Sequence, residues 1–397
     1  MVQRPDHVPP ALVREIDHVF GADFLADPFE AFRTLRDRPV HWSPVHGGYW
    51  VLTRTADIRA AMQRPDLFSS RYTGIPAHVS RAEKLAPLEM DPPEHTAYRR
   101  VIAPLLAPKA VASRVAAIEA SCSELVDAIA PKGSCELVAD FAQPFPTRIF
   151  TNLLGLPPAE AERFVSWNNL LLHNQDKPDV RREAGIDINT YLRELITERR
   201  REPREDMVSA LLAAVIDGEP ASDAQVQNLC FLLFIAGLDT VTAALSFCFR
   251  FLAEHPGHRR LLNERPELIP GAAEELLRVH AFINPARTVT RDTEFAGVTM
   301  REGDRVLCST ALASNDPEEF PDPLQVRFDR AANRHLAFGV GPHRCAGSHL
   351  ARDEMTTALR LWHAAIPDYD VAPGETITLH AGGAMGLDRL PLVWSSR

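Results

Sequence analysis

The sequence predicts a single large, mainly α-helical fold with a small β-sheet region. Helical spacing of apolar residues dominates the 397-residue chain, whereas strand-like alternation is confined to two short regions. No repeat, low-complexity stretch or Gly/Ser linker marks a domain boundary. We therefore expect residues 11–397 to form one domain. Residues 1–10, which carry three prolines, are expected to form a flexible N-terminal tail.

The helices and strands are assigned from the spacing of apolar residues. Apolar residues recur every three or four positions in residues 29–36, 160–172 and 191–199, which predicts amphipathic helices. A strand is predicted over residues 49–53, after two consecutive glycines. Further strands are predicted between residues 287 and 309, where glycines separate three short apolar runs.

Two helices stand out by length and pattern. The first begins at Ser222, where Gln225 completes a capping box, and remains apolar until Pro256. Its length is roughly 50 Å, and because it is apolar nearly all round we expect it to be buried at the centre of the fold. The second follows Cys345 and carries one continuous apolar stripe.

Composition excludes several classes of protein. The formal charge of −10 argues against non-specific binding of nucleic acid. No uninterrupted apolar run reaches the ~18 residues of a membrane span, and no signal peptide opens the chain, so we expect a soluble, cytoplasmic protein. The cysteines are scattered without a CxxC pair and are expected to be free thiols. They are Cys122, Cys135, Cys230, Cys248, Cys308 and Cys345.

The segment of residues 338–347, FGVGPHRCAG, is the most specific motif. Its glycines allow the backbone to approach a flat ligand closely. Cys345 stands just before a helix, where the helix dipole and free N–H groups lower the pKa of a thiol and favour the thiolate. The fixed spacing of Phe338, Gly339, Cys345 and Gly347 resembles the haem-binding signature of the cytochrome P-450 family. This resemblance implies haem b (iron protoporphyrin IX), with Cys345 as the axial ligand of the iron. The haem is then expected between the long central helix and the helix after the cysteine loop.

A second motif precedes the cysteine loop. Glu275 and Arg278 lie on one helix face at a spacing that suits an ion pair. In their place between the long helix and the cysteine loop they resemble the family's ExxR motif, which implies a buried pair that braces the loop. Its third member is either Arg330 or Arg327.

A third motif interrupts the long apolar helix at residues 236–240. A glycine and a carboxylate both cost stability in a buried helix, and such conflicts are expected at functional sites. The Thr240 hydroxyl is expected to bond back to the carbonyl of Ala236 and bend the helix locally. The segment resembles the family's acid–alcohol pair. The resemblance implies that Thr240 holds dioxygen and a water, and that Asp239 relays protons from solvent.

Cations are needed to hold the two haem carboxylates. His95 and Arg99 are spaced four apart on one helix, and Arg287 opens a strand. Arginine suits a carboxylate because its planar fork bonds both oxygens. The resemblance implies that His95, Arg99, Arg287 and His343 bind the haem propionates.

Within the family, the chain most resembles the bacterial camphor-monooxygenase-like branch, through residues 143–150, 237–241 and 390–394. The resemblance implies a [2Fe–2S] ferredoxin and its NAD(P)H-dependent reductase as electron donors. Arg59, Arg99 and Arg352 fall where that branch places its basic docking residues.

A substrate pocket is expected above the haem, between the long helix, the loop of residues 71–89 and the turn at residues 382–384. Its expected lining is Glu83, Leu88, Leu232, Ile235, Ala236, Ile283 and Ala384. The lining is mostly apolar and suits a hydrophobic substrate. The loop has no tyrosine after Tyr72, and camphor enzymes use a loop tyrosine to hold their ketone, so a substrate other than camphor is expected.

The sequence thus predicts a monomeric monooxygenase that takes O₂ and hydroxylates a terpenoid-like or other hydrophobic natural product. Two alternatives stay open. One is a haem-thiolate peroxygenase that uses peroxide, which the Asp239–Thr240 pair argues against. The other is a haem-binding sensor without catalysis, which would not need a proton relay.

Overall fold

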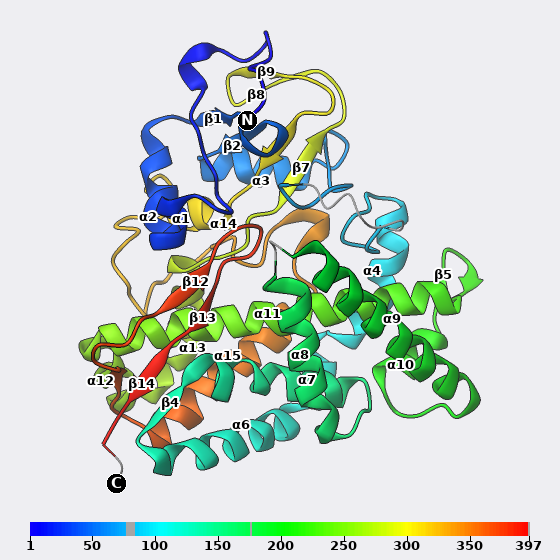
Figure 1. The fold of residues 1–397 in the computed structure, drawn as a ribbon, viewed down its shortest axis with the longest axis vertical. Helices are drawn as coiled ribbons and strands as arrows, with labels where there is room; N and C mark the ends of the chain where they lie inside the picture. The colour runs from blue at the N-terminus through cyan, green and yellow to red at the C-terminus, as the bar shows by residue number, and fades with distance from the viewer. Residues whose placement is uncertain (77–83, 175–176, 396–397) are drawn as a thin grey trace.

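The computed structural model describes residues 1–76, 84–174 and 177–395, and it confirms a mainly α-helical fold with a small β-sheet region (Figure 1). The helices are α1 Ala22–Ala26, α2 Pro28–Arg33, α3 Thr55–Gln63, α4 Glu94–Leu105, α5 Pro108–Ala112, α6 Val115–Ile129, α7 Pro144–Leu153, α8 Ala161–Leu172, α9 Pro178–Arg201, α10 Met207–Leu212, α11 Asp223–Glu254, α12 Pro256–Glu264, α13 Ile269–Val279, α14 Thr310–Ser314 and α15 Ser348–Ala365.

The strands form one five-stranded sheet and several smaller ones. They are β1 Val40–Ser43, β2 Tyr49–Leu52, β3 Phe68–Ser69, β4 Ser134–Glu136, β5 Val215–Ile216, β6 Glu219–Pro220, β7 Ala286–Val289, β8 Thr293–Phe295, β9 Val298–Met300, β10 Arg305–Leu307, β11 Asp370–Val371, β12 Thr378–His380, β13 Gly386–Arg389 and β14 Pro391–Val393. The large sheet has the order β1-β2-β10-β7-β3, with β10 parallel to β2 and the other neighbours antiparallel. Both predicted strand regions therefore meet in one sheet.

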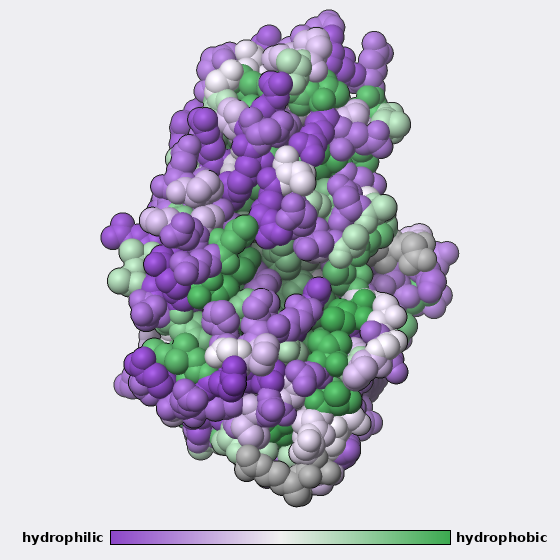
Figure 2. Space-filling model, turned by 90° about the vertical axis from the view of Figure 1, so that its left-hand side faces the viewer, coloured by the Kyte–Doolittle hydropathy of each residue, from purple (hydrophilic) through white to green (hydrophobic). Residues whose placement is uncertain are grey.

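Helix α11 is the central element of the fold. The Ser222 side chain and Gln225 form the predicted capping box at its start. The helix crosses the molecule between the part that holds the large sheet and the layer that holds α6 and α15 (Figure 1). It is long and apolar enough to cross a membrane, but 72% of its most apolar stretch is buried inside the fold. Hydrophilic residues predominate on the face shown in Figure 2, and hydrophobic residues form separate patches there. Because most of its apolar stretch is buried, helix α11 is a core helix of the fold.

The N-terminal segment differs from the expected flexible tail. Val8 is fully buried, the Val2 N–H donates to the Pro44 carbonyl, and His7 pairs with Asp304 at 2.9 Å. Residues 1–10 thus pack against the rest of the molecule. The prolines of this segment did not prevent packing, because Val8 supplies an apolar anchor that the composition alone did not weigh.

A local capping signal explains the start of one predicted helix, whereas the helix predicted over residues 191–199 is longer and extends over Pro178–Arg201 as α9. The predicted helix at residues 29–36 begins one residue earlier, because the Asp27 side chain accepts hydrogen bonds from the N–H groups of Phe29 and Glu30. It then tightens into a 3₁₀ turn at Thr34–Asp37. All six cysteines lie in the described part of the chain and are free, as predicted.

Candidate functional site

The cysteine loop folds back on itself just before α15. The Cys345 N–H donates to the Phe338 carbonyl at 2.8 Å, and Gly339 takes a positive φ of 64°. Gly341 also has a positive φ, and a Cβ there would lie 2.6 Å from the Met62 carbonyl oxygen. These glycines are therefore required, by conformation at both positions and by the close approach to α3 at Gly341.

Cys345 is a free cysteine, and the residue is exposed. Desolvation by the surrounding protein raises its pKa, while the Gly347 N–H, and then Arg99 and other nearby arginines, act in the opposite direction. The net pKa is raised, although the N–H at the helix N-terminus acts in the direction that the sequence predicted. Bound iron would change this balance, because a metal-coordinated thiol is deprotonated.

Glu275 and Arg278 form the predicted buried pair. Both side chains are completely buried, and two guanidinium N–H groups of Arg278 donate to the two Glu275 oxygens at 2.9 and 2.8 Å. The Arg330 side chain donates to the same carboxylate at 3.0 Å, so Arg330 is the third member. Arg327 contributes only its backbone N–H. Asn333, which the sequence did not single out, donates its amide to Glu275 at 3.1 Å.

This cluster braces the segment that leads to the cysteine loop. The Glu275 carboxylate accepts from α13 and from residues 327–333 at the same time. Burial raises the pKa of Glu275, but the Arg278 hydrogen bond and charge outweigh it, so the pKa lies below its ordinary value. The carboxylate is thus ionised, and the arginines that contact it balance its negative charge.

The acid–alcohol pair lies in the middle of α11. The Thr240 hydroxyl donates to the Ala236 carbonyl at 2.7 Å, as predicted, and the helix is continuous through this segment. Asp239 is buried and accepts a hydrogen bond from Nε2 of His173 at 2.8 Å. Asn168 lies 3.5 Å from the same carboxylate.

The electrostatics of this pair depend on His173. Burial raises the pKa of Asp239, but the hydrogen bond and charge of His173 act in the opposite direction. The net pKa is below the ordinary value. In turn, burial lowers the pKa of His173, while Asp239 and then Asp388 raise it above its ordinary value. His173 was not predicted to belong to the site, because it stands 66 positions from Asp239 and no local motif contains it.

Four cationic or imidazole side chains gather beside the cysteine loop. The rings of His95 and His343 lie 4.3 Å apart, and Arg287 is 4% exposed. The Arg99 guanidinium donates to the Arg344 carbonyl at 2.6 Å. The sequence predicted all four as one group, and the structure places the two imidazoles in contact.

This group is only weakly balanced by carboxylates, since burial lowers the pKa of His95 and Arg287 by more than Asp91 raises it. None of its four members forms an ion pair with a carboxylate in the described part of the chain. Both ring nitrogens of His95 and Nε2 of His343 are buried without a hydrogen-bond partner there. Burial lowers the pKa of His343 to about 3, and the nearby charges of Arg287, His95 and Arg99 add to that effect. Buried polar groups are rarely left unpaired, so the group fits an external dianion such as the two haem carboxylates.

The expected substrate-pocket residues are brought together only in part. Ile283 and Ala384 form an antiparallel β-bridge, so the turn at residues 382–384 lies beside the segment after α13. Leu232, Ile235 and Ala236 share one face of α11 with Asp239 and Thr240, by helical spacing.

The exposure of the remaining lining residues varies. Leu232 is buried, Ala236 is exposed, and Leu88 is 38% exposed. Glu83 lies outside the described residues, so its predicted role has no structural account.

The predicted docking arginines are engaged within the protein. Arg59 pairs with Glu319 at 3.1 Å. Arg352 bonds Glu274 at 2.5 and 3.0 Å and lies over the Phe338 ring. Their charges are thus partly neutralised, which the sequence did not reveal.

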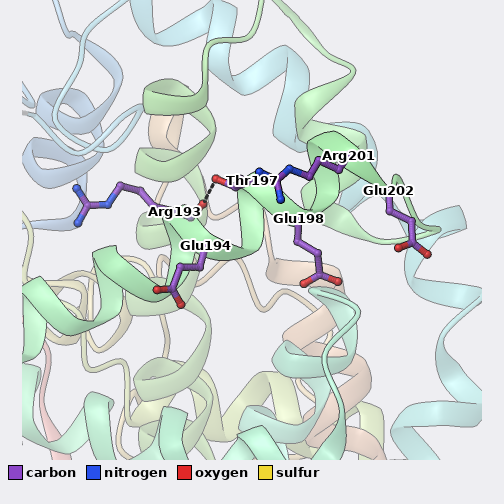
Figure 3. A pocket seen from close by; sticks show the side chains of 6 residues that line it. All are labelled: Arg193, Glu194, Thr197, Glu198, Arg201 and Glu202. Carbon is purple, nitrogen blue, oxygen red and sulfur yellow. Dashed lines mark hydrogen bonds between the residues drawn. The ribbon is translucent and has the colours of Figure 1, made fainter.

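A separate hollow lies on the outer face of α9 (Figure 3). Its lining residues are Arg193, Glu194, Thr197, Glu198, Arg201 and Glu202. The Thr197 hydroxyl bonds the carbonyl of its own helix at Arg193. These residues come from one helix face and include none of the predicted site residues, so the cysteine loop remains the candidate site.

The donor set around the cysteine loop fits a haem. A sulfur ligand stands at the start of α15, and Gly347 leaves the space beside it unfilled, since a Cβ there would approach Sγ only to 4.0 Å. The unpaired nitrogens of His95 and His343 match the carboxylates of the porphyrin.

Comparisons with known proteins agree with this geometry. Residues 165–362 match the family model described as Cytochrome P450. The chain is 37% identical to "Probable cytochrome P450 127A1" of Sinorhizobium fredii, over 98% of this chain and 97% of that protein. It is 36% identical to the "Mycinamicin IV hydroxylase/epoxidase" of Micromonospora griseorubida, over 87% of this chain and 89% of that protein.

A solved structure supports the same assignment. Cytochrome P450 CYP101C1 superposes with a TM-score of 0.93 at 33% identity, covering 99% of this chain and 100% of that one. Sequence, fold and donor set therefore agree, and the chain belongs to the cytochrome P450 family, whose members are monooxygenases with a cysteine-ligated haem b.

Proposed function

We propose that this chain is a ferredoxin-dependent monooxygenase that hydroxylates a hydrophobic small molecule, with Cys345 as the iron ligand. The observation that carries the proposal is that a free cysteine in a glycine-shaped loop lies beside arginines and histidines whose buried ring nitrogens have no hydrogen-bond partner in the described residues. When bound, a thiolate-ligated haem supplies an activated form of dioxygen, since the thiolate favours cleavage of the O–O bond. The protein supplies binding, orientation and protons.

Arg99, Arg287, His95 and His343 would hold the two haem carboxylates. The two arginines contribute permanent positive charge, and the two imidazoles contribute hydrogen-bond donors. An anion beside His343 would also raise its pKa, because it would offset the surrounding cations. This predicts tighter retention of haem than of its dimethyl ester.

Asp239 and Thr240 would deliver protons to the reacting oxygen. The Thr240 hydroxyl is anchored by its donation to the Ala236 carbonyl, which leaves its oxygen lone pairs free to accept a hydrogen bond from a water. Asp239 is ionised and bonded to His173, which is itself partly exposed. A proton could therefore pass from His173, near the surface, to Asp239 through their hydrogen bond. Thr240 is the next residue along α11.

The substrate is proposed to be a terpenoid-like or other hydrophobic natural product. Leu232 and Ile235 share a face of α11 with Thr240, and Ile283 pairs with Ala384 in a β-bridge; these four apolar residues are the proposed lining. The name of the Micromonospora griseorubida relative, a hydroxylase and epoxidase of mycinamicin IV, supports a natural product as the substrate class. Screening such compounds for the optical shift that accompanies loss of the iron-bound water would identify binders.

The proposed electron donor is a [2Fe–2S] ferredoxin with its NAD(P)H-dependent reductase, docked near Arg59, Arg99 and Arg352. Arg59 and Arg352 each pair with a glutamate, which reduces the positive charge that they offer to a partner. We therefore add the exposed Arg344 to the proposed docking surface. We further propose that the protein is a cytoplasmic monomer and that residues 11–397 act as one domain.

The ligand assignment is tested by spectroscopy of the purified holoenzyme. After reduction and addition of carbon monoxide, the wild type is expected to show the strongly red-shifted Soret band of a thiolate-ligated iron. Cys345→Ser is expected to lose that band, and Cys308→Ser, which changes a different buried cysteine, is expected to keep it. A red-shifted band in Cys345→Ser would contradict the proposal.

The proton-delivery role is tested by Thr240→Ala with Thr240→Ser as the matched control. With NADH, ferredoxin and reductase, the alanine variant is expected to consume oxygen while product falls and peroxide rises, and serine is expected to restore much of the coupling. Full turnover of the wild type with peroxide alone would favour the peroxygenase alternative. Absence of reductant-driven oxygen consumption would favour the sensor alternative.

A further inference from the structure

A cluster of two imidazoles and a carboxylate lies next to Asp239. His173 follows α8, His380 ends β12, and Asp388 lies on β13. Within the described part of the chain, these three residues bring one ligand atom each to within 4.8 Å of one another. His380 Nδ1 lies 2.7 Å and His173 Nδ1 lies 3.7 Å from the same Asp388 oxygen.

The hydrogen bond to Asp239 orients one of these imidazoles as a ligand. His173 Nε2 donates to the Asp239 carboxylate at 2.8 Å, so in the neutral ring the lone pair is on Nδ1. That nitrogen is the one near Asp388. Metal-binding histidines usually donate their other ring N–H to a carboxylate in this way.

The spacing is close to what a small divalent ion requires. Bonds of ~2.1 Å in tetrahedral geometry separate ligand atoms by about 3.4 Å. The distances of 2.7 and 3.7 Å bracket this value, so small side-chain shifts suffice.

The position of the His380 ring depends on Gly386. The ring lies against this residue, where an added Cβ would come within 2.6 Å of the ring. The absence of a side chain at residue 386 therefore gives the ring its present place.

The site is accessible and its charge favours a cation. The side chains of His173, His380 and Asp388 are 17%, 19% and 37% exposed. Two carboxylates, Asp239 and Asp388, contact the imidazoles. Nitrogen and carboxylate ligands together suit Zn²⁺ more than Ca²⁺ or Mg²⁺, which prefer oxygen alone.

We propose that His173, His380 and Asp388 form a binding site for a divalent transition-metal ion, with Zn²⁺ as the probe. Water would complete the coordination. The ion would join the end of α8 to the β12–β13 hairpin and would fix His173 against Asp239. If Asp239 delivers protons as proposed above, a bound ion would slow product formation by holding its partner in place. That consequence rests on the proposed function, whereas the binding itself does not.

The test is calorimetric titration of chelator-treated holoenzyme with Zn²⁺. The wild type is expected to bind one ion with saturation, and His380→Asn and Asp388→Asn are each expected to weaken binding by about tenfold or more. His7→Asn is the matched control, because His7 pairs with Asp304 at 2.9 Å with similar exposure but outside this cluster. It is expected to bind as the wild type does. Retention of the red-shifted band with carbon monoxide shows that each variant is folded.

Two outcomes would overturn the site: no saturable binding by the wild type, or equal binding by the wild type and both cluster variants. A second measurement follows product formation with and without Zn²⁺. The wild type is expected to slow and to recover with chelator, and His380→Asn is expected to respond less. Binding without any slowing would refute the link to Asp239 while supporting the site. Loss of the carbon monoxide band in the wild type would instead refute the proposed function.

Discussion

Two clusters near the cysteine loop each contain a buried arginine, Arg278 or Arg287, and they differ in how its charge is balanced. Around Glu275, the side chains of Arg278 and Arg330 find a carboxylate of the same chain, and Asn333 fills a further acceptor position. Around His343, by contrast, no ion pair forms in the described residues and imidazole nitrogens are left without partners. In the first cluster both arginines find their counter-charge as the chain folds, whereas an external anion would be needed to satisfy the imidazole nitrogens of the second. The comparison teaches that an unsatisfied cluster can identify a cofactor site as clearly as a motif does.

The largest effect is expected from breaking the first cluster. Glu275→Gln keeps the shape but leaves the buried Arg278 and Arg330 guanidiniums without a counter-charge. We expect a loss of about 3–5 kcal/mol in the free energy of unfolding, measured by urea denaturation, together with poor haem incorporation.

Glu274→Gln is the control for this change. Glu274 is the next residue on the same helix, but its pair with Arg352 is partly exposed, so the expected loss is about 1 kcal/mol or less. Equal losses of unfolding free energy in the two variants would mean that burial does not increase the contribution of Glu275 to stability.

The second cluster is expected to respond in the opposite direction. Arg287→Met removes a buried cation that forms no ion pair with a carboxylate of the described residues, so the haem-free protein should become more stable by about 1–2 kcal/mol. The same variant should release haem faster, because a carboxylate partner is lost. Haem transfer to an acceptor protein and urea denaturation of the haem-free form measure the two effects.

Arg305→Met separates this effect from a general loss of charge. Arg305 lies on the neighbouring strand and one of its guanidinium nitrogens donates to the carbonyls of Tyr72 and Gly74, while its Nε is buried without a partner in the described residues. We expect it to destabilise the haem-free protein and to leave haem retention nearly unchanged. A haem-free Arg287→Met that is less stable than the wild type would show that the second cluster is not short of an anion.

A smaller effect tests how complete the first cluster is. Asn333→Ala removes one of the donors to Glu275 but leaves both arginines in place. We expect a loss of about 1 kcal/mol, because a hydrogen bond to a charged group is lost while the carboxylate stays paired. A loss as large as that of Glu275→Gln would make Asn333 a member equal to the arginines.

The sequence predicted those features whose residues are close together in the chain or belong to a fixed motif. The spacing of Glu275 and Arg278, the capping box at Ser222 and the bond from Thr240 to Ala236 are local, and all three are present. Arg330 remained one of two choices, because only the folded chain brings it to Glu275.

The features that the sequence did not predict arise from contacts between distant segments. Asn333 stands 58 positions from Glu275, and His173 stands 66 from Asp239. The neutralisation of Arg352 by Glu274 also depends on how α13 packs on α15. The net pKa of Cys345 has a related cause, since the helix N-terminus is a local signal and acts as predicted, whereas desolvation depends on the folded surroundings.

The smallest expected effect concerns the pH dependence of the exposed neighbour of the first cluster. Burial raises the pKa of Glu274, but His335 and Arg352 lower it by a larger amount. The net pKa is about 2 instead of the ordinary 4.5. The folded state therefore binds the proton less readily than the unfolded state. The resulting stabilisation is present above pH 4.5 and is lost as the pH falls toward 2.

The difference in unfolding free energy between the wild type and Glu274→Gln isolates this contribution. It is expected to be constant above pH 4.5, about 1 kcal/mol or less because the pair is partly exposed, and to shrink as the pH is lowered. Urea denaturation of both proteins at several pH values measures it. The Glu275→Gln difference should persist over the same upper part of the range, because a fully buried carboxylate with two arginines gives up its charge less readily than one with a single arginine and solvent. A difference for Glu274→Gln that grows on acidification would reverse the sign of the argument and would place the two glutamates in the same class.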